Sequence, residues 1–113
     1  MFTQKELSQI DHDYFLVKSA GCYGVTLLSK CTKHCWYITS EDYGSFQTCT
    51  IFHTHHEGTS MHEHGHGRNL HSCIRQIQSH DEYQIRKDAS RRRRNRDRRR
   101  MARIEVEELI TTI

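Results

Sequence analysis

The longest strand candidate in the chain is the stretch Phe46-Gln47-Thr48-Cys49-Thr50-Ile51-Phe52-His53-Thr54-His55. Aromatic and β-branched residues are frequent in it, which is typical of a strand. Side chains two residues apart point to the same face of a strand. Cys49, Ile51 and the two histidines therefore share one face, so an apolar patch continues directly into a pair of imidazoles.

Three shorter strand candidates precede this stretch, and turn-forming residues separate them. The connections are short, which favours an antiparallel meander. The segment 57–67 contains three glycines and no apolar periodicity, so it is expected to be a long loop. The candidate strands before Phe46 are 14–18, 23–29 and 34–40.

Helices are predicted on both sides of the strands. Thr3 and Glu6 form a capping box for a short helix over 3–10. Asn69 is a suitable N-cap for a second helix that runs to about Tyr83 or beyond. The second helix has a core-facing stripe formed by Leu70, Cys73, Ile74 and Ile77. The expected fold class is α+β: an antiparallel sheet of about four strands, a short N-terminal helix, one packed helix after the sheet, and a basic C-terminal arm that is helical or disordered.

Charge is distributed unevenly along the 113 residues, although the net charge is only +3. Residues 1–85 carry 6 basic and 9 acidic side chains, whereas residues 86–103 carry 11 basic and 2 acidic ones. Residues 104–113 add three glutamates and no basic residue. We therefore expect two parts: a small α+β domain with a histidine-rich loop over 1–85, and an arginine-rich arm with an acidic and apolar tip over 86–113.

Several protein classes are excluded by composition. No stretch approaches the roughly 18–20 apolar residues of a membrane span. The N-terminus has no apolar core of a signal peptide, and the five cysteines are an odd number. We therefore expect a cytoplasmic protein with reduced thiols, no membrane partner and no complete disulfide framework.

Histidine is concentrated between positions 53 and 71, where it supplies seven residues. His53 and His55 project from one face of a strand, roughly 7 Å apart by strand rise, and can close on one ion. The loop that follows repeats the alternation and can fold back over the pair. Neutral imidazole favours zinc, copper, iron or nickel, and zinc is the expected ion. The candidate ligands are His53, His55, His62, His64 and His66.

Other interpretations of the histidines remain open. Cys49, or Cys31 together with Cys35, can add a thiolate ligand, and His34 lies beside that cysteine pair. The metal can be structural or catalytic, and the histidines can equally form a solvated polar loop without a metal. A hairpin, histidines and a following helix also occur in the order that a ββα-metal nuclease requires, with His53 or His55 activating water. No residue is assigned a catalytic role.

The arginine-rich segment predicts phosphate binding, because guanidinium groups stay charged and bind phosphate through two hydrogen bonds. Such contacts carry no sequence information, so DNA and RNA are both expected partners, and a nucleic-acid-handling protein is the alternative. The oligomeric state is left open. The candidate residues are Arg91, Arg92, Arg93, Arg94, Arg96, Arg98, Arg99 and Arg100.

Two resemblances bear on these expectations. The predicted order of elements is similar to the double-stranded-RNA-binding domain, but 67–71 lacks the lysine cluster of that family, so its function is not transferred. The stretch 46–83, with its segments IFHTHH and SHDEY, resembles short uncharacterised proteins of phages and conjugative elements of Firmicutes. That resemblance implies a regulatory or nucleic-acid-binding protein of a mobile element, or an anti-CRISPR-like inhibitor of a host defence nuclease.

Overall fold

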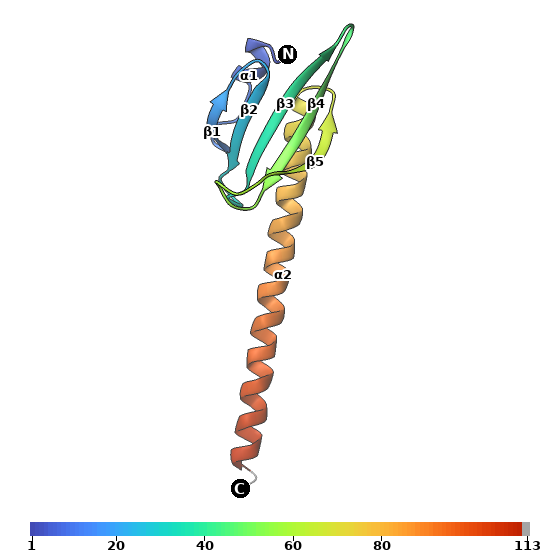
Figure 1. Ribbon diagram of the computed structural model, residues 1–113. Coiled ribbons are helices and arrows are strands. Elements are labelled where there is room, and N and C mark those ends of the chain that lie inside the picture. Colours follow the sequence, from blue (N-terminus) through green and yellow to red (C-terminus); the bar gives the residue numbers. More distant parts are fainter. Residues whose placement is uncertain (112–113) are drawn as a thin grey trace. The chain divides into compact units, whose positions relative to one another are not determined.

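The computed structural model describes residues 1–111 and has an α+β fold, as the sequence predicts (Figure 1). A five-stranded antiparallel sheet follows a short helix and precedes a long one. The elements are α1 (Gln4–Ser8), β1 (Phe15–Ala20), β2 (Gly24–Ser29), β3 (Cys35–Tyr43), β4 (Phe46–Thr54), β5 (His62–Gly67) and α2 (Leu70–Thr111).

The sheet is a simple meander in the order β1-β2-β3-β4-β5, with every neighbouring pair antiparallel. The expectation of about four strands is wrong, because β5 forms within 57–67, the segment predicted as a loop. Its sequence HEHGHG contains no apolar residue and two glycines, which are unfavourable in strands. No alternation of apolar and polar residues therefore marks it, and the exposed edge of β4 supplies its hydrogen-bonding partner.

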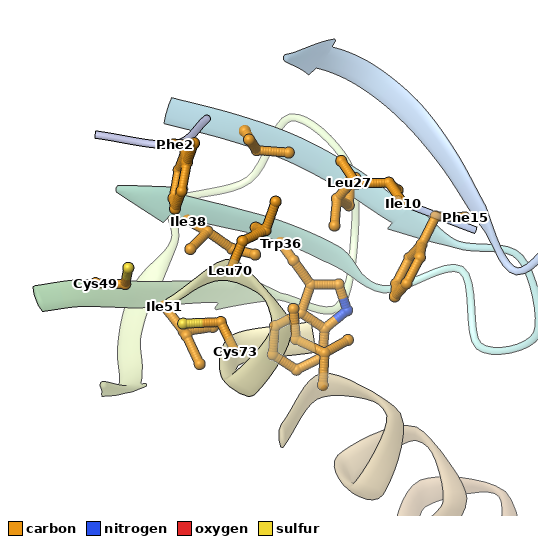
Figure 2. Packing of buried hydrophobic residues seen from close by; sticks show 12 residues of the cluster. Phe2, Ile10, Phe15, Leu27, Trp36, Ile38, Cys49, Ile51, Leu70 and Cys73 are labelled. Atoms are coloured by element: carbon orange, nitrogen blue, oxygen red, sulfur yellow. The ribbon is translucent and has the colours of Figure 1, made fainter. Parts of the chain in front are cut away.

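One face of the sheet carries the core, and the first turns of α2 pack against that face (Figure 2). The stripe predicted on this helix is confirmed: three of its four members are fully buried, and Ile74 is partly buried against them. Trp36 lies at the centre, and its indole N–H donates to Ser29 Oγ over 3.1 Å. The strands contribute Val25, Leu27, Trp36, Ile38, Cys49 and Ile51, and the helix contributes Leu70, Cys73 and Ile77.

Both helix starts are capped as predicted. The Thr3 hydroxyl accepts from the backbone N–H of Glu6, and the Glu6 carboxylate accepts from the backbone N–H of Thr3. At the second helix, Asn69 Oδ1 accepts from the backbone N–H of Ser72 at 2.8 Å. Glu6 also accepts from the backbone N–H of Leu70, so one carboxylate serves both helix starts. These bonds satisfy donors that a helix leaves without internal partners.

The chain divides into two compact units, residues 1–81 and 82–113. The first contains the sheet, α1 and the first turns of α2. In the second, α2 continues through the arginine-rich segment to Thr111, while the last two residues of the predicted acidic and apolar tip lie outside the described residues. No helix within residues 1–111 combines the length and apolar character needed to cross a membrane.

Candidate metal centre

Three histidines from distant parts of the sequence meet at the end of the core. His53 lies on the inner face of β4, two residues after the core residue Ile51. His34 directly precedes β3, and His80 lies on α2, three residues after the core residue Ile77. Each histidine thus lies at the next inward-facing position after, or before, a buried core residue. The three inward-facing rows of side chains meet at this end of the core.

The ring nitrogens of these three histidines lie close enough to share one ion. One nitrogen from each ring lies within 4.8 Å of the other two. The closest pair is His53 Nε2 and His34 Nδ1, which are 3.0 Å apart. Ligands on a tetrahedral zinc ion lie about 3.3 Å apart, given zinc–nitrogen bonds of about 2.0–2.1 Å. Shifts of roughly 1 Å or less in each ring are therefore sufficient to form such a site.

The surroundings favour the uncharged form of His53 and His80. Burial, followed by the neighbouring histidines with His80 first among them, lowers the pKa of His53 to about 3. Burial also lowers the pKa of His80 and that of His64. A neutral imidazole has a free lone pair, which is the form that binds a metal ion. His80 Nδ1 is buried and has no hydrogen-bond partner among the described residues.

Further aromatic rings surround the triad. Trp36 stacks on His53 with ring centres 4.1 Å apart, so the indole of the core forms one wall of the site. His55 stacks on His34, with centres 4.4 Å apart and planes 10° apart. His62 and His64 approach His53 edge-on, at 5.3 and 5.5 Å. Six imidazoles therefore gather at one end of the core.

The ligand set predicted from the sequence is only partly brought together. His53, His55, His62 and His64 all belong to this group of rings, but His66 does not. Instead, His66 pairs with Glu63 at 2.7 Å and contacts the Thr50 hydroxyl at 3.4 Å, on the other face of the sheet.

A β-bulge explains why His66 turns away. His62 pairs with His53 and Glu63 with Phe52, but the register between β4 and β5 then shifts, and His64 is the extra residue. In a regular strand, His62, His64 and His66 would share one face. The inserted residue reverses the alternation, so His66 pairs with Thr50 and faces outward. Sequence periodicity does not reveal a bulge, so the alternation expected of His62, His64 and His66 does not extend to His66.

His34 and His80 were not predicted as ligands, although each carries a detectable signal. His80 continues the apolar stripe of α2 at the next helical position after Ile77. His34 lies beside the start of β3, two residues before Trp36. Neither residue falls in the histidine-rich stretch 53–71, so only the fold brings them to His53.

Thiolate ligands do not join the triad. The group of ligand atoms found within residues 1–111 contains histidines alone. Cys49 hydrogen-bonds to Cys73 within the core, and that bond, followed by burial, raises the pKa of the Cys73 thiol (Figure 2). Cys35 precedes the inward-facing Trp36 and therefore points away from it.

A buried carboxylate connects two of the three histidine-bearing segments. Asp81 is fully buried and follows His80 directly. Its carboxylate accepts hydrogen bonds from the Tyr14 hydroxyl at 2.7 Å and from the Thr32 hydroxyl at 3.0 Å. The Thr32 hydroxyl oxygen also accepts from the backbone N–H of His34 at 3.3 Å. Burial and the nearby Asp81 raise the pKa of Tyr14, which therefore remains a donor.

The eight arginines predicted to bind nucleic acid all lie on α2, and all are exposed. Arg91 forms an ion pair with Asp88 at 3.0 Å, one turn earlier on the helix. An exposed pair of this kind contributes at most about 1 kcal/mol, so it leaves the guanidinium available to a partner.

No protein-family model, curated protein or solved structure matches the chain. The functional argument therefore depends on the chemistry of these two groups of residues.

Proposed function

We propose that this protein binds one transition-metal ion, with zinc expected, and that the ion stabilises its fold. The observation that carries this proposal is the convergence of one nitrogen each from His34, His53 and His80 within 4.8 Å. Imidazole nitrogens are ligands that zinc prefers, and the three come from separate elements of the fold. The Nδ1 atom of His80 is buried and has no hydrogen-bond partner among the described residues. Leaving such an atom unsatisfied costs about 1–3 kcal/mol, and a metal bound to it would remove that cost.

The stabilisation expected from the metal is large for a domain of this size. An ion that binds only the folded state adds about 4 kcal/mol when its free concentration is a thousand times Kd. For a domain of 60–100 residues, each kcal/mol raises Tm by about 4–8 °C. Removing the metal should therefore lower Tm by about 15–30 °C.

The test is metal analysis by mass spectrometry on untagged protein purified without a metal column, together with thermal melts with and without chelator. We expect about one equivalent of zinc and a chelator-sensitive Tm. His53→Ala and the less buried His80→Ala should both lose the metal, whereas His71→Ala, at an exposed histidine, should keep it. A metal-free protein whose Tm ignores both zinc and chelator would refute the proposal.

We further propose that the arginine-rich part of α2 binds nucleic-acid phosphates. The supporting observation is charge density: residues 91–100 carry eight exposed arginines and one aspartate on a continuous helix. At 1.5 Å per residue, this segment presents a net charge of +7 over about 15 Å. Duplex DNA carries one negative charge per 1.7 Å, or about nine over the same length, so the two charge densities are similar.

Salt dependence tests this second proposal. Fluorescence anisotropy with a labelled duplex should give log K falling with log salt at a slope of about −5 or steeper, as expected for six or more phosphate contacts. Replacing Arg91 through Arg94 by glutamine should make that slope shallower by up to about 3.6, while the matched lysine variant should retain it. Duplex binding that survives deletion of residues 86–113 would refute the role of this segment, and no binding at low salt would favour an acidic protein partner instead.

A further inference from the structure

Strand β5 has almost no side-chain packing to hold it in the sheet. Its sequence is His62-Glu63-His64-Gly65-His66-Gly67, and all four of its non-glycine side chains are exposed. Histidine and glycine contribute little to strand stability, and β5 lies at the edge of the sheet. Besides its backbone pairing with β4, β5 receives a hydrogen bond from Gln76 Nε2 to the His66 carbonyl at 2.6 Å, and Gly67 lies close to Cys73. Its histidine rings provide the side-chain contacts with the end of the core.

The β-bulge in this strand directs one of those rings toward the proposed metal ligands. His64 is the inserted residue, and bulges commonly redirect a side chain in this way. Its ring lies 4.9 Å from that of His80 and 5.5 Å from that of His53, at steep angles of 89° and 64°. It also meets Trp36 edge-on at 5.2 Å.

These separations match the arrangement of imidazoles around a tetrahedral ion. Four rings bound to one zinc have centres about 5 Å apart, from the zinc–nitrogen bond length and the tetrahedral angle. The two separations of His64 lie near this value, as do those between His34 and His53 (5.0 Å) and between His53 and His80 (4.8 Å).

The other two nearby histidines are less suitable as a fourth ligand. His55 stacks face to face on His34, with planes only 10° apart, so their in-plane lone pairs do not converge on one point. His62 approaches His53 at 5.3 Å from the position before the bulge. His64 is the ring outside the triad that approaches two of its members edge-on.

We propose that His64 is the fourth ligand, so that the metal closes a four-histidine site and fastens β5 to the sheet and to α2. This inference rests on the proposed function, because it requires that the triad binds a metal. A closed site has no open position for a substrate, which makes the metal structural rather than catalytic. It also makes the order of β5 dependent on the metal.

Cobalt(II) is a suitable probe, because its visible spectrum reports the coordination number directly. The wild-type protein should show the intense bands of tetrahedral cobalt, and added azide should not change them. His64→Ala should bind cobalt about tenfold or more weakly, and azide should then change its spectrum by occupying the vacated position. His66→Ala, on the same strand but facing outward, is the matched control and should behave like wild type.

Hydrogen exchange of the β5 amides tests the structural consequence. Zinc should slow exchange in 62–67 by about tenfold or more in the wild type and in His66→Ala, but not in His64→Ala. Because His64 is exposed, its variant should keep the exchange protection of β3, which verifies that the sheet remains folded.

The possible failures are distinguishable. If wild-type protein binds no cobalt, the proposed metal site itself is wrong. If wild-type protein binds cobalt but azide changes its spectrum, or His64→Ala binds as tightly as wild type, His64 is not a ligand although the triad is. If zinc protects the β5 amides equally in His64→Ala, the metal does not fasten this strand through His64.

Discussion

Replacing Asp81 with alanine should cost about 3 kcal/mol of folding free energy and should also weaken metal binding. The Asp81 carboxylate is fully buried and accepts hydrogen bonds from Tyr14 at 2.7 Å and Thr32 at 3.0 Å. Hydrogen bonds to charged groups contribute about 1.5–3 kcal/mol each, so the two together give about 3–6 kcal/mol. We expect the lower end of this range, because the alanine variant no longer buries a charged carboxylate, and this gain offsets part of the lost hydrogen bonding.

Metal binding should suffer because the same network positions two of the proposed ligands. Asp81 is adjacent to His80, and Thr32, which donates to Asp81, accepts from the backbone N–H of His34. Without the carboxylate, the segment that carries His34 loses this hydrogen-bonded connection to the helix that carries His80. A loss of about tenfold in affinity or more is expected, as for other residues that orient metal ligands.

Urea unfolding, monitored by the fluorescence of Trp36 with chelator present, measures the free energy of unfolding of the metal-free protein. Asp81→Asn keeps the shape and one acceptor oxygen, so it should cost less than half as much as alanine. Asp13→Ala, at an exposed carboxylate, should cost less than about 0.5 kcal/mol. A cost below about 1 kcal/mol for Asp81→Ala, or equal costs for alanine and asparagine, would refute the role assigned to this network.

Two further predictions concern the histidines and the contact between β5 and α2. Below the ordinary histidine value of 6.5, the unfolded chain takes up a proton that His53, with its pKa lowered to about 3, does not. His53 alone should therefore cost the metal-free protein up to about 1.4 kcal/mol of stability per pH unit as pH falls from about 6 to 3. Urea melts that give constant stability over this range would contradict this. A methyl group on Gly67 would lie 2.6 Å from Cys73 Sγ and 2.7 Å from Ser72 Oγ, so Gly67→Ala should cost about 1–3 kcal/mol. Gly65→Ala, which meets only the end of the Gln76 side chain at 3.1 Å, should cost clearly less in the same melts.

The elements predicted correctly are those with a local chemical signature. The capping box of Thr3 and Glu6 locates α1, and the apolar stripe from Leu70 to Ile77 locates the packed part of α2. Strand β5 lacks such a signature, because HEHGHG has neither apolar alternation nor strand-forming residues. The continuation of α2 beyond residue 83 is equally hard to locate, because no apolar stripe marks helical residues that face solvent on every side.

The candidate site shows a different limit on prediction from sequence. Alternation along β4 correctly places His53 beside Ile51 on the inner face. His34 and His80 lie 19 and 27 positions away in the chain, and they join His53 only through the pairing of β3 with β4 and the packing of α2. The histidine-rich composition of 53–71 therefore points to the region where the imidazoles gather, but not to all of the histidines that meet there.

The candidate metal site and the hydrophobic core are in direct contact, so the stability of one depends on the other. Trp36 pairs with His53 across the two central strands, and its ring packs both in the core and on that imidazole. The register that buries Trp36 and Ile51 is therefore the register that points His53 inward, because a slip of β4 by one residue would turn Ile51 and His53 to the outer face together. A metal bound to His53 would stabilise the same strand pairing that the core stabilises. Apolar packing would thus preorganise the ligands, and the ion would in turn secure the end of the core at which the imidazoles gather.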